Sequence, residues 1–241
     1  MDTVASFDRA AECYAAFAAP QAALASTLAA WITPAERRGC ALEFGAGPGL
    51  LTERLLPWAG QYYATDAAPA MLARGQARCP SIIWKLCDAR DPANPGPADW
   101  LFACGLLQWL PDPATILRRW RSHLLPGGCL AVGIWLPGTL GELASLLPEA
   151  TPVRWRSASE WAAIFASAGF ALERAETWEH LSHHPSALHF LRAVHAMGLA
   201  PRRVVGPGRL RSALRAYDLR FSTTGGVRAT WRAWLARARP A

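Results

Sequence analysis

The sequence predicts an α/β protein whose mostly parallel sheet is covered by helices on both faces. Short apolar segments alternate with helical segments from residue 40 to residue 135, and this order is typical of a parallel sheet. A glycine-rich turn follows the first apolar segment directly, and an aspartate ends each of the next two. Apolar residues make up 52% of the 241 residues and charged residues 18%, so the composition predicts an ordered chain with a full hydrophobic core.

Six segments have the length and apolar character of buried strands. They are Cys40–Phe44, Tyr62–Thr65, Ile82–Cys87, Trp100–Cys104, Cys129–Trp135 and Phe170–Trp178. The stretch 227–237 is open to two interpretations. The spacing of Trp231, Trp234 and Leu235 favours a helix, and a closing strand is the alternative.

Helical segments lie before and between these strands. They are Phe7–Ile32, Leu50–Leu56, Pro69–Arg78, Pro113–Leu124 and Ser157–Ala168, with further helices expected in residues 185–216. Pro20 should break or kink the first helix, because proline has no amide hydrogen to donate. The turn Pro126-Gly127-Gly128 closes the fourth helix, and Gly169 ends the fifth.

The charge balance is basic and almost entirely due to arginine. Lys and Arg outnumber Asp and Glu by 25 to 18, which gives a formal net charge of +7, and Lys85 is the only lysine. This excess fits an acidic partner, whereas no basic run or recognised motif indicates nucleic acid. No apolar run long enough to span a membrane and no signal peptide is evident. The six cysteines form no C-x-x-C pair, so we expect reduced thiols in a cytoplasmic protein.

Five of the six histidines cluster in one part of the sequence, at positions 180, 183, 184, 189 and 195. Metal binding needs several ligands at set spacings, and no Cys or carboxylate joins these histidines at such an interval. We therefore expect no metal site.

The segment Glu43-Phe44-Gly45-Ala46-Gly47-Pro48-Gly49 has the features of a nucleotide-binding turn. Glycines there permit a tight turn and let a ligand approach the backbone closely. The glycine spacing is shorter than the G-x-G-x-x-G that dinucleotides prefer. Glu43 would repel phosphates but attract a cationic group. We therefore expect Glu43, Gly45, Gly47 and Gly49 to bind a ligand with a cationic end, and this disfavours a nicotinamide dinucleotide.

Two aspartates follow the second and third predicted strands. The carboxyl ends of parallel strands meet at one edge of the sheet, where open α/β sheets bind ligands. Asp66 lies 19 residues after Gly47, at the position where an acid accepts hydrogen bonds from both hydroxyls of a ribose. Asp88 can accept a hydrogen bond from an adenine amino group. The two aspartates therefore predict a site for a nucleoside.

The glycine-rich turn, Asp66, Asp88 and the turn Leu125-Pro126-Gly127-Gly128 together resemble class I methyltransferases, which use S-adenosylmethionine. Further segments resemble the malonyl-acyl carrier protein O-methyltransferases of biotin synthesis. They are Phe7-Asp8-Arg9-Ala10-Ala11 with Tyr14 and Gln21, Leu107-Gln108-Trp109, Gly138-Thr139-Leu140-Gly141-Glu142-Leu143, Phe190-Leu191-Arg192 with Met197-Gly198, and Gly226-Val227 with Thr230.

This resemblance implies a Rossmann-like methyltransferase fold in a single domain, with a seven-stranded sheet and a small helical lid. Residues 1–35 would form an N-terminal helical cap and residues from about 36 to 180 the core that binds S-adenosylmethionine. Residues from about 181 to 220 would form the lid over the substrate, and residues 221–241 the closing segment.

The resemblance also implies a reaction, in which a methyl group passes from S-adenosylmethionine to the free carboxylate of malonyl-acyl carrier protein. Such a carboxylate is ionised at neutral pH, so no general base is needed. We expect Arg192 to hold the carboxylate, and Tyr14 to orient the sulfonium or the acceptor. Gln21 would help to close the N-terminal helix over the cofactor, and Trp109 would line the pocket.

The acyl carrier protein is an acidic partner that the basic charge balance fits. Arg202, Arg203, Arg209 and Arg211 form a basic stretch that we expect to dock it.

The sequence departs from this family at three places, one of which is the unusual Pro20 before Gln21. Phe17 stands where the family commonly has His, and Ala103-Cys104 stand where it often has Ser-Asn. These departures sustain a second hypothesis, a methyltransferase for another small carboxylate or a polyketide-type acceptor. A catalytically weak Rossmann module that binds a protein partner is a third.

Overall fold

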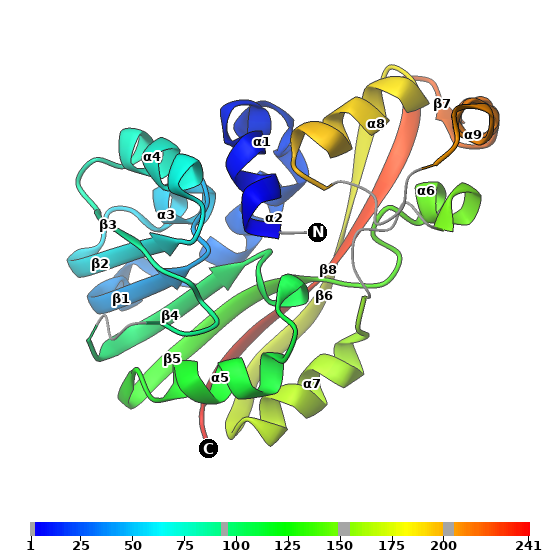
Figure 1. Ribbon diagram of the computed structural model, residues 1–241. Coiled ribbons are helices and arrows are strands. Elements are labelled where there is room, and N and C mark those ends of the chain that lie inside the picture. Colours follow the sequence, from blue (N-terminus) through cyan, green and yellow to red (C-terminus); the bar gives the residue numbers. More distant parts are fainter. Residues whose placement is uncertain (1–2, 93–95, 149–154, 200–204) are drawn as a thin grey trace.

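The computed structural model describes residues 3–92, 96–148, 155–199 and 205–241 (Figure 1). Its strands are β1 (Arg38–Phe44), β2 (Ala59–Asp66), β3 (Ile83–Leu86), β4 (Ala98–Cys104), β5 (Leu124–Trp135), β6 (Phe170–His184), β7 (Ser222–Thr223) and β8 (Gly226–Pro240). Its α-helices are α1 (Thr3–Phe17), α2 (Ala19–Ala29), α3 (Leu50–Leu55), α4 (Pro69–Arg78), α5 (Pro113–Arg121), α6 (Gly141–Leu146), α7 (Ala158–Ser167), α8 (Ala187–Ala196) and α9 (Pro207–Arg220). Two 3-10 turns are η1 (Pro34–Glu36) and η2 (Leu107–Trp109).

Seven strands form one continuous sheet in the order β3-β2-β1-β4-β5-β8-β6, and the two-residue β7 pairs with β8. Each neighbouring pair from β3 to β5 is parallel, whereas β8 runs antiparallel to both β5 and β6. The predicted Rossmann-like α/β fold with a mostly parallel sheet is therefore confirmed. This strand order places the carboxyl ends of β1, β2 and β4 next to one another.

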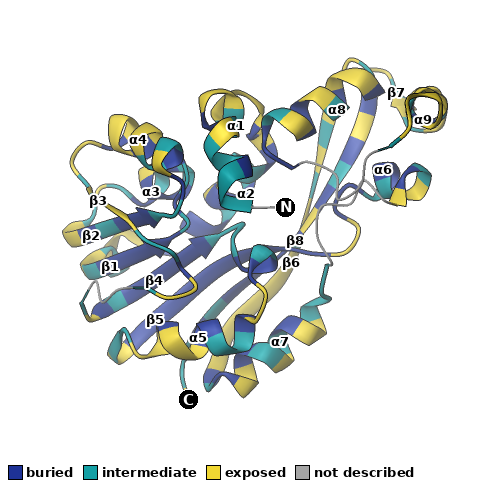
Figure 2. Cartoon of the chain, viewed as in Figure 1, coloured by how far each residue is buried: buried dark blue, intermediate teal, exposed yellow. Residues whose placement is uncertain are grey.

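Helices bury both faces of the sheet, and the interior strands are correspondingly dark in Figure 2. Helices α2 and α3 pack on one face, and α5 and α7 pack on the other. Successive side chains of a strand point to opposite faces. Leu42 and Phe44 of β1 therefore join the cluster beneath α5, where the Phe44 ring stacks on that of Trp120 at 4.6 Å. Glu43, between them, points to the side of α3, and its hydrogen bond to Thr52 of that helix follows from this alternation.

The helix favoured for residues 227–237 is wrong, because these residues lie in β8 and the alternative interpretation, a closing strand, is correct. β8 is an interior strand, so both of its faces are buried. Trp231 and Leu235 pack into the cluster on the α2 side, and Trp234 packs into the cluster on the α7 side. Apolar residues on both faces of a strand gave the spacing that looked helical.

The strand β6 extends into the residues that the sequence analysis assigns to a lid. β6 continues to His184 and pairs with β8 as far as Val227, so the first residues assigned to the lid belong to the sheet. The two long strands extend beyond β5 as a ribbon, and Figure 1 shows α8 and α9 at its far end. Helix α5 likewise ends at Arg121, earlier than predicted, because β5 begins at Leu124. Over the described ranges, no helix is both long enough and apolar enough to cross a membrane.

The N-terminal helical segment is two helices, and the break at Ala18 lies next to Pro20, as predicted. Two hydrogen bonds hold α1 in place. Asp8 Oδ1 accepts from the backbone N–H of Ala70 at the start of α4, at 2.7 Å. Ser6 Oγ donates to the carbonyl of Gly198, beyond α8, at 3.0 Å. Helix α1 therefore contacts both the start of α4 and the residues that follow α8.

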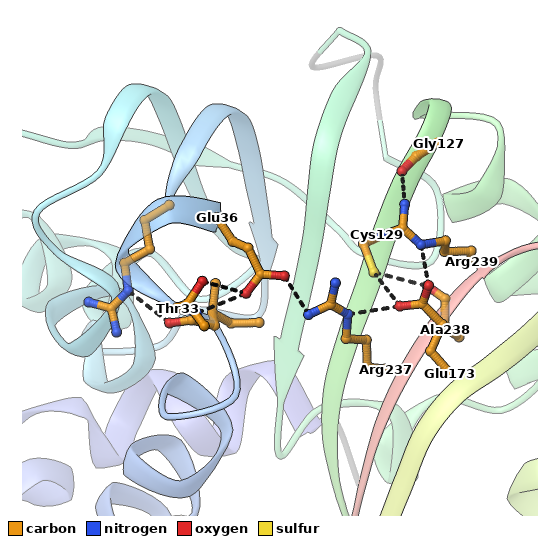
Figure 3. Close-up of polar contacts among 10 residues, drawn as sticks. Thr33, Glu36, Gly127, Cys129, Glu173, Arg237, Ala238 and Arg239 are labelled. Atoms are coloured by element: carbon orange, nitrogen blue, oxygen red, sulfur yellow. Dashed lines mark hydrogen bonds and ion pairs between the residues drawn. The ribbon is translucent and has the colours of Figure 1, made fainter.

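A network of charged side chains ties β8 to the amino-terminal side of the sheet (Figure 3). Arg237 donates to Glu36 at 2.7 Å and to Glu173 at 2.9 Å, and its guanidinium lies 4.9 Å from the centre of the Trp100 ring. Arg239 donates to Glu173 and to the carbonyl of Gly127. The network lies away from the carboxyl ends of the strands, so it secures the fold at a distance from the predicted site.

Candidate functional site

Two adjoining cavities lie at the carboxyl ends of β1, β2 and β4. The outer cavity has a volume of about 470 Å³, and its lining includes Gly47, Asp66, Asp88, Arg90 and Leu106. The inner cavity has a volume of about 60 Å³, and its lining includes Gln21, Glu43, Trp135, Leu140 and Trp231. Phe7, Tyr14, Cys104 and Trp109 line both cavities. Side chains from α1 therefore stand where the two cavities meet.

The glycine-rich turn needs its glycines for two different reasons. Gly45, Gly47 and Gly49 have φ values of +63°, +56° and +82°, which residues with side chains rarely adopt. A Cβ at Gly45 would lie 2.9 Å from the side chain of Leu106, so this glycine serves close packing. A Cβ at Gly47 would meet nothing within 4 Å, because this glycine faces open space. The turn therefore exposes its backbone to the cavity at Gly47.

Asp66 lines the outer cavity, and backbone amides hold its carboxylate in place. Oδ2 accepts from the N–H of Gly47 and Oδ1 from that of Ala68, both at 2.8 Å. Burial raises the pKa of Asp66 above its ordinary value, and these backbone N–H groups oppose the rise. Each oxygen retains a lone pair beyond these bonds, so the carboxylate can also accept hydrogen bonds from ligand hydroxyls.

Asp88 also lines the outer cavity, but its carboxylate forms an ion pair with Arg90. The Nε of Arg90 donates to both oxygens at 2.9 Å, and the backbone N–H of Arg90 donates to Oδ1 at the same distance. These bonds hold the pKa of Asp88 below its ordinary value. The sequence prediction placed Asp88 correctly at the strand ends and gave no sign of this ion pair.

Glu43 is 1% exposed at the end of β1 and lines the inner cavity. Its Oε2 accepts from Thr52 Oγ1 and from the hydroxyl of Tyr62, both at 2.7 Å. Burial raises the pKa of Glu43 to about 7, although the two hydrogen bonds oppose the rise. A cation in the inner cavity would favour the ionised carboxylate, so the site is suited to a positively charged group.

Gln21, Tyr14 and Trp109 all line the cavities, as the sequence predicts for residues that contact a ligand. The Oε1 of Gln21 is buried and has no hydrogen-bond partner among the described residues, so it is available to a ligand N–H. Burial raises the pKa of Tyr14 far above its ordinary value, and nearby Cys104 and Asp66 add to this effect. The Tyr14 hydroxyl therefore stays protonated and can donate a hydrogen bond.

The structure does not bring Arg192 to the site. Its side chain is exposed on α8, and it is absent from the described residues that line either cavity. The physical reason is the pattern of α8, whose buried face consists of Ala187, Phe190, Ala193 and Val194. Arg192 lies on the opposite face, and this geometry gives no support for its predicted role in holding a carboxylate.

Arg209 and Arg211 of the predicted docking stretch lie on α9, and both are exposed. Arg202 and Arg203 fall outside the described residues.

Sequence reasoning missed several residues that shape the site. Thr52 and Tyr62 orient Glu43, and no spacing in the sequence marks them out. Gln108, in the resembling Leu107-Gln108-Trp109 segment, donates to the carbonyl of Gly105 at 2.5 Å and so braces the wall of the cavities. Trp155 and Leu199 complete the apolar lining of the inner cavity.

Comparison with known proteins identifies the family. Residues 42–130 match the family described as Methyltransferase domain. A trans-aconitate 2-methyltransferase of Azoarcus sp. strain BH72 is 35% identical over 127 residues, which are 51% of this chain and 48% of that protein. The biotin biosynthesis bifunctional protein BioCD of Bordetella avium is 32% identical over 234 residues, 88% of this chain and 48% of that protein. The chain thus matches about half the length of each of these two relatives.

A third relative matches over most of both sequences. It is a trans-aconitate 2-methyltransferase of Rhizobium leguminosarum bv. trifolii, 30% identical over 200 residues that cover 76% of this chain and 77% of that protein. The chain is a class I S-adenosylmethionine-dependent methyltransferase. A solved structure of a putative methyltransferase from Bacillus halodurans C-125 has the same fold, with a TM-score of 0.67 at 16% identity, over 89% of this chain and 98% of that one.

The residues of this methyltransferase fit its cofactor. Gly47 leaves open space beside the turn, and Asp66 would hold the ribose hydroxyls. Asp88 stands at the end of the outer cavity that suits the adenine. The orphaned oxygen of Gln21 and the buried carboxylate of Glu43 both face the inner cavity, where a cationic amino-acid end would find acceptors.

Proposed function

We propose that this methyltransferase esterifies the free carboxylate of malonyl-acyl carrier protein. The observation that carries the proposal is the lack of cationic side chains in the described lining of the inner cavity. Besides the polar side chains of Gln21, Glu43 and Thr139, its described lining contains mainly aromatic and aliphatic side chains, and no arginine or lysine. A wall of this kind favours an acceptor with one carboxylate and an otherwise uncharged end, because each further buried charge would need its own partner.

The residues around the inner cavity favour a reaction without a general base. Bound S-adenosylmethionine supplies a methyl group on a positively charged sulfur, and this charge also offsets that of one acceptor carboxylate. A malonyl carboxylate is already ionised at neutral pH. Burial keeps Tyr14 and Cys104 protonated by raising the pKa of each, so neither is suited to remove a proton. The chain's contribution is to position the acceptor and to exclude water.

The matched relatives support this acceptor in part. The BioCD protein, named for biotin biosynthesis, matches 88% of this chain, a share that extends beyond the core to the lid region. The trans-aconitate 2-methyltransferases of Azoarcus and Rhizobium leguminosarum match 51% and 76% of the chain. An acceptor on a carrier protein is held by the lid as well as the core, so similarity over the lid region favours it.

The surface of α9 suits an acidic carrier protein. Arg211, Arg215 and Leu219 succeed one another at intervals of four residues, so they lie on one face of the helix. Both arginines are exposed, and Leu219 is 81% exposed. Asp218 is the one acid among the described residues of α8 and α9, and its carboxylate accepts from the backbone N–H of Ala187. This face therefore offers positive charge beside an apolar side chain.

A second candidate acceptor is a small free polycarboxylic acid. Two of the matched relatives are named as trans-aconitate 2-methyltransferases, and aconitate carries three carboxylates. The absence of cations from the described lining of the inner cavity disfavours it. It stays a candidate because Phe17 and Ala103-Cys104 depart from the pattern of the malonyl-carrier family.

One assay separates the two acceptors. The purified chain is incubated with S-adenosylmethionine labelled on the methyl group and with malonyl-carrier protein, acetyl-carrier protein or trans-aconitate. Label on the malonyl protein alone supports the proposal. Label on trans-aconitate alone supports the second candidate. Label on neither, from a chain that binds the cofactor, rejects both.

A further inference from the structure

The segment after β5 leaves the sheet, yet its side chains continue to bond β8 as a strand would. The N–H of Arg232 donates to Thr139 Oγ1 at 3.0 Å, and this hydroxyl donates to the carbonyl of Arg232 at 2.7 Å. The N–H of Thr230 donates to Glu142 Oε2 at 3.0 Å, and the Thr230 hydroxyl donates to Oε1 at 2.6 Å. Thr139 and Glu142 therefore satisfy the N–H groups of Arg232 and Thr230 where β5 has ended, while the carbonyl of Arg232 also accepts from the N–H of Leu136 at 2.8 Å.

These bonds are shielded from water. Thr139 is 2% exposed and Glu142 is 7% exposed. A buried carboxylate is costly unless it is fully bonded, and Glu142 has Arg228 at 3.7 Å in addition to both bonds from Thr230. Thr139 and Glu142 are thus a fixed part of the structure.

Leu140 lies between Thr139 and Glu142 in an unfavourable conformation. Its φ of 56° and ψ of 30° are left-handed, and in the described part of the chain no other residue with a side chain has a positive φ. Such strain persists only when neighbouring contacts impose it, and it is concentrated at functional sites. Leu140 lines the inner cavity, is 2% exposed, and donates its N–H to the carbonyl of Thr230 at 2.8 Å.

We infer that Thr139 and Glu142 are positioning residues, which hold Leu140 as a wall of the inner cavity and so determine which acceptors fit. This inference rests on the proposed function, because it takes the part of the inner cavity beside Leu140 as the place of the acceptor and the part beside Gln21 and Glu43 as that of the cofactor's amino-acid end. It also accounts for the segment Gly138-Thr139-Leu140-Gly141-Glu142. Gly138 has a φ of +93°, and a Cβ there would lie 2.7 Å from Arg232 Cδ, so Gly138, Thr139, Leu140 and Glu142 all serve the junction with β8.

Four variants test the inference. In Glu142→Ala the bonds to Thr230 are lost, and we expect the KM for the acceptor to rise about tenfold while kcat and cofactor affinity change less than about threefold. Glu142→Gln can still accept from the Thr230 N–H and donate to its hydroxyl, so it should restore the KM. Leu140→Gly relieves the strain but removes the wall and a buried side chain, so it should raise the KM and also lower Tm. Glu176→Ala, an exposed site on β6, is the matched control and should change nothing.

An unchanged acceptor KM in Glu142→Ala and Leu140→Gly would overturn the inference, even if Glu142→Ala has a lower Tm. If the unaltered chain labels no acceptor, the proposed function has failed. Amide hydrogen exchange then tests by itself whether the bonds of Thr139 and Glu142 to β8 hold Leu140 in place. Exchange at Leu140 should be at least about tenfold faster in Glu142→Ala than in Glu142→Gln. Equal rates would overturn the inference.

Discussion

The carboxylate of Asp66 accepts a hydrogen bond from the backbone N–H of Gly47 at 2.8 Å. This bond joins the turn after β1 to the end of β2, so the two parts of the cofactor site are held together before any ligand binds. The turn is thus preorganised, and changes at its glycines can be separated into effects on folding and effects on binding.

Gly47→Ala should impair cofactor binding more than folding. The new methyl group would occupy open space in the free chain, so the stability cost is that of a left-handed alanine, about 1–2 kcal/mol. The same methyl group would stand where the cofactor approaches the backbone, and we expect the Kd for S-adenosylmethionine to rise about tenfold or more. Calorimetric titration and urea denaturation measure the two effects.

Gly45→Ala is the matched comparison. Its methyl group would overlap the side chain of Leu106, so this variant should lose more stability than Gly47→Ala. Equal Kd values for Gly47→Ala and the unaltered chain would show that the cofactor does not approach this turn.

Glu43 should make stability depend on pH. Burial raises its pKa from 4.5 to about 7, so the folded chain binds this proton more tightly than the unfolded chain does. The resulting contribution is complete below pH 4.5 and is lost as the pH rises through 7, a change on the order of 3 kcal/mol. Glu43→Gln has no such proton. The stability of the unaltered chain relative to Glu43→Gln should therefore fall between these pH values in urea denaturation, and a constant difference would contradict the prediction.

Glu43 should also make cofactor binding depend on pH. A cationic group beside it favours the ionised carboxylate, so affinity for S-adenosylmethionine should weaken below pH 7, by up to about tenfold per pH unit. In Glu43→Gln this dependence should disappear. A dependence of equal size in both chains would assign the titration to another group.

Reversing the charge on α9 should weaken binding of the carrier protein. In Arg211→Glu with Arg215→Glu we expect the KM for malonyl-carrier protein to rise about tenfold and its salt dependence to fall, with cofactor affinity unchanged. Arg118→Glu, exposed on α5, is the control. Reversal of Arg202 and Arg203, which the sequence also suggests for docking, is a second arm of the experiment. An unaltered KM in both arms would remove the lid as the docking surface.

Removing Arg237 should destabilise the sheet without affecting the cavities. In Arg237→Ala both Glu36 and Glu173 lose a hydrogen bond and Trp100 loses its cation contact, at a cost of about 2 kcal/mol. Cofactor affinity should be unchanged, because the network in Figure 3 lies at the other end of the strands. The free energy of unfolding measures the first effect, and a weaker cofactor affinity would reveal coupling between the two ends.

The parts of the molecule that depend on local order could be predicted from the sequence. Strand ends are ordered along the chain and meet at one edge, so Glu43, Gly47, Asp66 and Asp88 could be assigned to one site before their distances were known. The fold class followed from the alternation of strands and helices, and the cofactor from these residues together with the resemblance to class I methyltransferases.

The parts that depend on long-range packing could not be predicted. β8 is buried on both faces, so its apolar spacing did not reveal a strand. Arg192 could be placed on a helix by sequence, but which face of α8 is buried depends on contacts with α1 and α9. Thr139 and Glu142 act on β8 residues about 90 positions away, and only the folded chain brings them together.

The position of β8 sets the order of events during synthesis. This strand is translated after every other strand of the sheet, yet it lies between β5 and β6. Until it is made, β5 has an open edge and β6 has no neighbour in the sheet. A ribosome-bound chain must therefore keep two unsatisfied strands from pairing with other molecules, a known route to aggregation. The inner cavity, whose wall includes Trp231, is completed only once this last strand has been inserted.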